Sequence, residues 1–177
     1  FKCDWSSDVC SSDLFLESLV RPGLDLRNWT ARSNYPARGV VPTGEAEMSI
    51  YVQRNYGQPT HCLERLVLRT DGFAAVHAGY QSGEMTTRPL LFTGNRLTLN
   101  LSASAAGGVR VELQDAAGKP LPGFTLEDCL ELNTDDLACT VHWKKNADVG
   151  ALAGKPVRIR FQLKDADLYA MQFVAQP

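Results

Sequence analysis

The sequence contains no basic cluster and no long apolar run. Its 18 basic and 20 acidic residues give a formal net charge of -2 at pH 7, so the positive patch that nucleic-acid-binding proteins use is missing. No apolar stretch approaches the roughly 20 residues that a membrane-spanning helix needs. We therefore expect neither nucleic acid nor a membrane among the partners of this protein.

The first 14 residues do not resemble a natural protein segment. Residues 4–14, DWSSDVCSSDL, match the translation of a common sequencing-adapter string in one frame, residue for residue. The alternative is a natural linker rich in Ser and Asp, but such linkers do not carry tryptophan in this order. We therefore interpret residues 1–14 as adapter-derived, without structure. On that interpretation the natural N-terminus is missing. The localisation of the protein therefore stays open, and a location outside the cytoplasm is one of the alternatives.

Cysteine is scarce in the remaining sequence. Two of the five cysteines fall within residues 1–14, which leaves Cys62, Cys129 and Cys139. An odd number argues against a disulfide framework and leaves the redox state of these thiols open. A zinc site at Cys129, Cys139 and His142 is disfavoured, because strand alternation puts Cys139 and His142 on opposite faces. We expect no metal and no other cofactor.

The dominant pattern is the alternation of apolar and polar residues in short runs, which predicts β-strands. Such runs occur at 97–101, 109–113, 139–143 and 157–163. Turn-forming residues separate the runs, at 70–72, 93–95, 106–108, 133–136 and 164–167. About ten strands at this spacing predict an all-β fold, an antiparallel two-sheet sandwich of the jelly-roll type.

Candidate sites for chemistry or binding are few. The sequence has no nucleophile elbow, zinc-protease motif or phosphate-binding glycine loop. A sugar-binding module needs exposed aromatic rings, for which Tyr51, Tyr56 and Tyr80 are candidates. Trp143 shares its strand face with apolar residues, so we expect it in the core. The polar face of the predicted strand 47–54 is either a solvent face or the wall of a pocket.

Six segments stand out by their order and spacing: EMSIY at 47–51, LRTDGF at 68–73, GEMTTRPL at 83–90, GNRLTLN at 94–100, VRVEL at 109–113 and GKPVRIRF at 154–161. Together they resemble the C-terminal part of bacterial proteins related to family 32 glycoside hydrolases. In that family a five-bladed β-propeller precedes a β-sandwich. The resemblance covers most of the chain from Glu47 onward.

The resemblance implies that residues 15–58 are a loop and a remnant of the last propeller blade, and that residues 59–177 are the sandwich. The family's catalytic acids lie in earlier blades. Its aspartate nucleophile, Arg-Asp-Pro motif and Glu-Cys acid have no counterpart here, so no catalytic residue is carried over. Arg32, Glu47 and Tyr51 are expected to contact a substrate only where the missing blades complete the site.

We therefore predict a non-catalytic C-terminal β-sandwich of a truncated glycoside-hydrolase-like protein. Its expected partner is the missing N-terminal propeller, which it packs against and stabilises. Glycoside hydrolysis is then expected of the parent protein and not of this fragment. The alternative is a carbohydrate-binding module that stacks Tyr51, Tyr56 and Tyr80 on sugar faces. An unpartnered apolar face favours the first prediction, whereas coplanar exposed rings on one surface favour the second.

Overall fold

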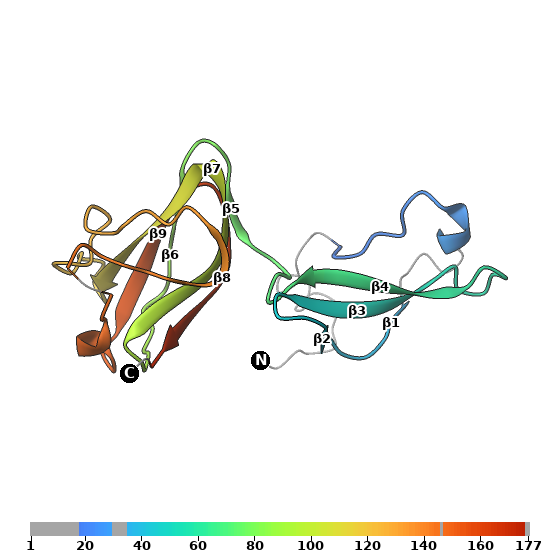
Figure 1. Cartoon of the computed structure of the whole chain (residues 1–177), viewed down its shortest axis with the longest axis horizontal. Helices are drawn as coiled ribbons and strands as arrows, with labels where there is room; N and C mark the ends of the chain where they lie inside the picture. Colours follow the sequence, from blue (N-terminus) through green and yellow to red (C-terminus); the bar gives the residue numbers. More distant parts are fainter. Residues whose placement is uncertain (1–17, 30–34, 146, 176–177) are drawn as a thin grey trace. The chain divides into compact units, whose positions relative to one another are not determined.

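The computed structural model of the chain describes residues 18–29, 35–145 and 147–175. These residues form β-strands and two short 3-10 helices, and no α-helix occurs among them. None of the helices in the described ranges has the length and apolar character needed to cross a membrane. The chain divides into two compact units between Leu68 and Arg69, and the strands of each are labelled in Figure 1. Residues 1–14, interpreted above as adapter-derived, lie outside the described residues.

The first unit is built around one antiparallel hairpin, which follows a short 3-10 helix, η2 (Leu26–Trp29). The hairpin consists of β3 (Glu47–Arg54) and β4 (Cys62–Arg69). Two short strands, β1 (Tyr35–Pro36) and β2 (Val41–Pro42), also pair with β3. The strand expected at residues 47–54 is confirmed with the same bounds, because its alternation continues up to a turn signal.

The turn that joins β3 to β4 contains two residues with left-handed backbone conformation. Asn55 has a φ of 52° and Gly57 a φ of 75°, and these residue types adopt positive φ more readily than others. The domain boundary expected after residue 58 falls in this turn. The pairing of β4 with β3 places the whole of β4 in one sheet with the strands that precede it.

The second unit contains one antiparallel sheet with the strand order β5-β9-β7-β8, in which β6 also pairs with β9. Its central strands are β7 (Arg96–Asp115) and β9 (Val157–Val174). The remaining elements are β5 (Val76–Ala78), β6 (Gly83–Thr86), β8 (Asp135–Thr140) and a 3-10 helix, η3 (Gly150–Leu152). β9 therefore pairs with residues that lie far away in the sequence, such as Val76, which stands opposite Leu168.

β7 and β9 lie side by side along most of their length and bend at the same place (Figure 1). The register passes from Ala103↔Ala166 to Gly108↔Lys164, so residues 104–107 of β7 stand opposite Asp165 alone. Asp165 has a φ of 42°. The turns expected at 106–108 and 164–167 are therefore wrong. Both segments belong to one β-bulge inside continuous strands, and bulges bend the sheet that contains them.

The bend brings two layers of the sheet together over one core. Leu97 and Leu99 precede the bend in β7, Val111 and Leu113 follow it, and all four belong to a single cluster of buried residues. β9 adds Phe161, which is fully buried, to the same cluster. One dry core between two antiparallel layers makes this unit a β-sandwich. The prediction of an all-β, antiparallel sandwich is confirmed.

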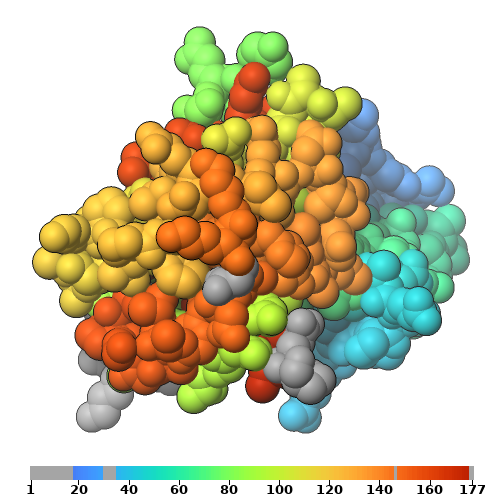
Figure 2. Space-filling model, turned by 60° about the vertical axis from the view of Figure 1, so that its left-hand side comes forward, coloured from blue at the N-terminus to red at the C-terminus, as the bar shows by residue number. Residues whose placement is uncertain are grey.

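The loops between β7 and β8 and between β8 and β9, coloured yellow to orange in Figure 2, gather on one face of the sandwich. Trp143, from the second of these loops, is 2% exposed and confirms the prediction that it lies in the core. Its indole Nε1 donates a hydrogen bond to the carbonyl oxygen of Val111 at 3.0 Å. Its ring meets that of Phe124 edge-on, with 5.2 Å between centroids. The loops thus help to close the core.

Candidate functional site

The polar face of β3 holds an ion-paired cluster around Glu47. Its Oε1 lies 2.6 Å from Nη2 of Arg65 on β4, and Nε of Arg65 donates to the hydroxyl of the buried Ser49 at 2.9 Å. Tyr51 lies on the same strand face and is half-buried. Arg32, expected beside Glu47 and Tyr51, lies outside the described residues. The ion-pair partner of Glu47 is therefore Arg65, which the sequence analysis did not single out, and the Thr43 hydroxyl donates to the same carboxylate oxygen at 3.0 Å.

The aromatic candidates are divided between the two units. Tyr56, in the first unit, is exposed, and its ring packs against Tyr35 with 4.9 Å between centroids and against His61 with 6.2 Å. Tyr80, in the second unit, is 69% exposed, and the ammonium of Lys164 lies 4.8 Å from the centre of its ring. Sugar stacking on these rings and on Tyr51 stays a prediction.

The three cysteines of the described chain are free thiols in different environments. Cys62 is exposed, Cys139 is half-buried and Cys129 is buried. Burial raises the pKa of the Cys129 thiol to about 11, although a hydrogen bond from the Val111 amide to its Sγ acts in the opposite direction. Burial also raises the pKa of Cys139. Within the described ranges, no three His, Cys, Asp or Glu side chains gather as a metal site requires.

Alkylation by iodoacetamide at pH 8 is expected to modify Cys62 in the native protein and to leave Cys129 unmodified. The thiolate is the reactive species, and with a pKa of about 11 only about one Cys129 thiol in a thousand is ionised at that pH. Peptide mapping by mass spectrometry distinguishes the two sites, and unfolding in urea should expose Cys129. Equal labelling of both cysteines before unfolding contradicts the buried position of Cys129.

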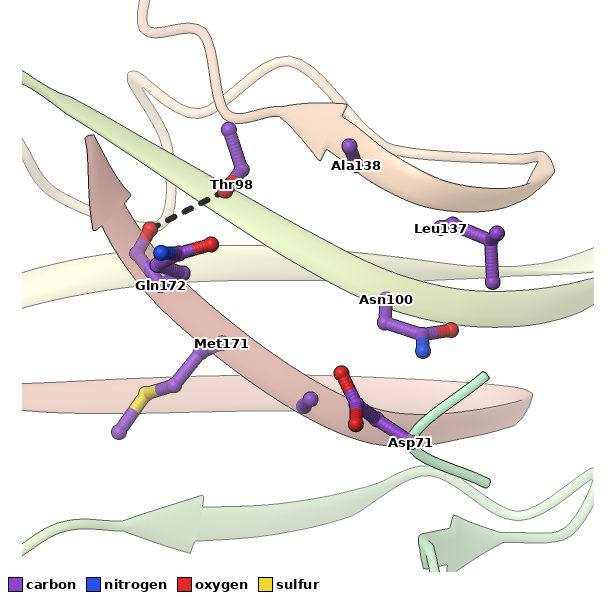
Figure 3. Close-up of a pocket in the computed structure, with 8 residues that line it drawn as sticks. Asp71, Thr98, Asn100, Leu137, Ala138, Met171 and Gln172 are labelled. Atoms are coloured by element: carbon purple, nitrogen blue, oxygen red, sulfur yellow. Dashed lines mark hydrogen bonds between the residues drawn. The ribbon is translucent and has the colours of Figure 1, made fainter. Parts of the chain in front are cut away.

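One hollow of the sandwich lies over the parts of β7, β8 and β9 that Figure 3 shows. Its volume is about 290 Å³, and Asp71 is the one titratable residue in its described lining. The hydroxyl of Thr98 donates to the carbonyl oxygen of Gln172 at 3.2 Å. Asn100 is held by Arg69, whose Nε donates to its Oδ1 at 2.5 Å. With a single titratable side chain among the described residues that line it, this hollow lacks an acid–base pair.

A second hollow, which we call the sheet groove, lies on the face of β7 and β9 that points away from the core. Its volume is about 490 Å³. The strand register sets Glu112 opposite Arg160 and Arg110 opposite Gln162, because alternate residues of a strand share a face. The residues that line it are Arg110, Glu112, Pro120, Thr125, Leu126, Glu127, Arg160 and Gln162.

An arginine between two carboxylates organises the sheet groove. Nη2 of Arg160 lies 2.9 Å from each carboxylate oxygen of Glu84, and its Nη1 lies 3.4 Å from Oε1 of Glu112. Hydrogen bonding to Glu84 is the main cause that raises the pKa of Arg160. Glu112 is only 4% exposed, and its carboxylate accepts further hydrogen bonds from Gln114 Nε2 at 2.8 Å and from the Leu126 amide at 3.2 Å.

The sheet groove adjoins a smaller hollow of about 210 Å³, which shares Arg110 and Gln162 with it. The smaller hollow is also lined by Ser82, Glu131 and Lys164. Nη2 of Arg110 lies 3.4 Å from Oε2 of Glu131. Two groups of paired charges therefore lie on the outer face of the sheet, one around Arg160 and one formed by Arg110 and Glu131.

The sequence analysis did not identify the residues of the sheet groove. A signal is present, because the polar residues Arg110, Glu112 and Gln114 alternate with core residues, as do Arg160 and Gln162. That alternation predicts an outward face and says nothing about which strand lies beside it. Only the pairing of β7 with β9 brings the five side chains together.

Comparison with known proteins adds no assignment to this geometry: no family model, no curated protein and no solved structure matches the chain.

Proposed function

We propose that this chain supplies a non-catalytic accessory module, in which a β-sandwich accompanies a sheet that packs against a companion β-propeller domain and stabilises it. The proposal rests on the resemblance to proteins related to family 32 glycoside hydrolases and on the unequal burial of the two units. In this arrangement the four-stranded sheet of the first unit is the last blade of the propeller. Hydrolysis of a glycoside takes place in the companion domain, where that family has its catalytic acids.

The observation that carries the proposal is the distribution of apolar residues. Among the described residues, 20 of the 22 buried hydrophobic side chains lie in the second unit, and Met48 and Val52 are the two in the first. Of the 16 exposed large hydrophobic residues, 10 lie in the first unit. A small sheet becomes stable when its apolar face packs against another element. The first unit therefore offers apolar surface to a companion.

The strand β4 presents the most prominent part of that surface. Within the described part of the chain it pairs with β3 alone, so it forms an edge of the sheet described here. Leu63 and Val67, on one face of β4, are 62% and 52% exposed. An uncovered edge beside exposed apolar residues is an aggregation hazard that proteins normally cover. A neighbouring blade supplies both strands for the edge and side chains for the face.

Without a companion, the chain is expected to self-associate through this surface. Light scattering over a series of protein concentrations should show an apparent mass that rises with concentration. Replacing Leu63 with Lys places a charge on the surface of β4. The protein concentration at which self-association sets in should then be about tenfold higher, since burying that charge at a contact costs more than about 1.4 kcal/mol.

A matched control comes from the sandwich. Leu91 is 69% exposed, so Leu91→Lys makes the same chemical change at a site of similar exposure. We expect it to leave self-association unchanged. A wild-type chain that stays monomeric at every concentration, or a Leu91→Lys variant that is as effective as Leu63→Lys, contradicts the proposal.

A further inference from the structure

The hollow in Figure 3, which we call the Asp71 hollow, is lined by a charged group that has no counterion. Asp71 is the one titratable residue in its described lining, and no other described residue forms an ion pair or hydrogen bond with the Asp71 carboxylate. In Figure 3 this carboxylate lies over β9, between Asn100 and Met171. The hollow therefore contains an acceptor that the fold itself leaves unused.

The turn that contains Asp71 is fixed to the sandwich by its neighbours. The guanidinium of Arg69 donates to Oδ1 of Asn100 at 2.5 Å and to backbone carbonyl oxygens of β7 and β8 at 3.0 and 2.8 Å. Asn100 is 5% exposed and donates from Nδ2 to the carbonyl oxygen of Thr70 at 2.7 Å. The Gly72 amide donates to the carbonyl oxygen of Arg69 at 2.9 Å. The backbone at Asp71 is thus in place before a ligand arrives, which lowers the entropy lost on binding.

The segments that border the Asp71 hollow carry an excess of negative charge. Residues 69–72 and 135–138 include the three carboxylates of Asp71, Asp135 and Asp136 and one cation, Arg69. Arg69 forms its ion pair with Asp135, so the charge of Asp71 is not neutralised by it. An anionic ligand would be repelled at short range, whereas a cationic ligand would be attracted.

The remaining lining of the Asp71 hollow suits a short apolar chain. Its apolar residues come from β8 and β9 and are Leu137, Ala138, Ala170 and Met171. Met171 is 39% exposed, so its flexible thioether side chain is free to adapt to a ligand. The volume of about 290 Å³ lies at the lower end of the range of roughly 300–1,000 Å³ that is typical of ligand sites. The hollow therefore fits a small molecule or a single side chain.

From this geometry we infer that the Asp71 hollow binds an organic cation, an ammonium or guanidinium group on a short apolar chain. The cationic head pairs with the Asp71 carboxylate, and the apolar chain lies against Leu137 and Met171. Small amines carry such a group, and so do the lysine and arginine side chains of a partner protein. All lining residues belong to the second unit, so the inference does not depend on a companion propeller.

The test uses the whole chain and n-butylguanidinium, with amide NMR spectra as the readout. This cation should bind with a dissociation constant of about 1–10 mM and shift the amide signals of Gly72 and Ala138, which adjoin Asp71 and Leu137 in the sequence. N-butylurea has nearly the same shape without the charge and should bind at least about fivefold more weakly. Methylguanidinium lacks three methylene groups and should bind about tenfold more weakly, since it buries less apolar surface. No binding of n-butylguanidinium, or equally tight binding of N-butylurea, overturns the inference.

A blocked arginine, Nα-acetyl-arginine N-methylamide, distinguishes the two sources of the cation. If it binds as tightly as n-butylguanidinium, the hollow admits a side chain that is attached to a protein backbone. If it binds at least tenfold more weakly while n-butylguanidinium binds as expected, the ligand is a small free cation. Either result supports an organic cation as the ligand.

Two matched variants locate the site. Asp71 and Asp165 both have left-handed backbone conformation, with φ of 55° and 42°, which asparagine also adopts. Asp71→Asn and Asp165→Asn therefore remove the same charge without straining the backbone, and Asp165 lies outside the lining of the Asp71 hollow. Asp71→Asn should weaken the binding of n-butylguanidinium about fivefold, and Asp165→Asn should leave it unchanged within about twofold. Equal effects of the two variants would show a general attraction of cations to the protein and overturn the inference.

Discussion

Replacing Trp143 with Ala is expected to lower the free energy of unfolding of the sandwich by about 3–5 kcal/mol. The indole is 2% exposed, so its removal leaves a cavity that the rigid strands around it fill only in part. The carbonyl oxygen of Val111 also loses its hydrogen bond from the indole at 3.0 Å, and an unsatisfied buried acceptor adds to the loss. Urea unfolding followed by far-UV circular dichroism measures the change.

Trp29 provides the matched control for this experiment. It lies in the first unit, is 44% exposed and donates its indole hydrogen bond to Gly23 at 2.8 Å. Trp29→Ala should leave the unfolding of the sandwich unchanged within about 0.5 kcal/mol. A loss below about 1 kcal/mol for Trp143→Ala shows that the ring of Trp143 does not fill the core.

The bulge between β7 and β9 predicts a second large effect, for Gly107→Ala. A Cβ atom at this position would overlap the carbonyl oxygens of Lys164 and Asp165 on the opposite strand. Both obstacles are backbone atoms of a paired strand, so the sheet must open or shift to accept the methyl group. We expect the free energy of unfolding to fall by about 2–3 kcal/mol, measured as for Trp143→Ala.

Gly79 is the control for the bulge. A Cβ atom added there has no other atom within 4 Å, and its φ lies outside the left-handed region. Gly79→Ala should therefore change the free energy of unfolding by less than about 0.5 kcal/mol. If Gly107→Ala is as harmless as Gly79→Ala, the two strands do not approach each other at the bulge as described, and the bend has another cause.

The strands could be predicted from the sequence wherever the residue pattern is compatible with only one kind of local structure. The alternation from Glu47 to Arg54 ends at turn residues on both sides, so the strand bounds agree with β3. The pattern at 106–108 has two interpretations, because glycines serve both hairpin turns and bulges. The choice between them depends on whether the partner strand continues opposite. That partner, at residues 157–174, is distant in sequence.

The residues of the candidate sites could likewise be predicted only in part from the sequence. The sequence suggested Glu47, Tyr51, Tyr56 and Tyr80 from residue type and from the strand face. It gave no reason to prefer Glu112 to other outward-facing carboxylates, because its burial depends on Arg160 and on the loop that contains Leu126. Contacts between residues separated by 14 and 48 positions follow from register and loop path, which local alternation does not encode.

The central claim of the proposed function is that the first unit needs a companion, whereas the sandwich is complete. Hydrogen exchange of the whole chain, followed residue by residue, tests it most directly. We predict slow exchange for the paired amides of β7 and β9, close to the limit set by global unfolding. The amides of β3 and β4 should exchange at least about 100-fold faster, since few apolar residues are buried around them. Protection of β3 and β4 equal to that of β7 and β9 contradicts the claim.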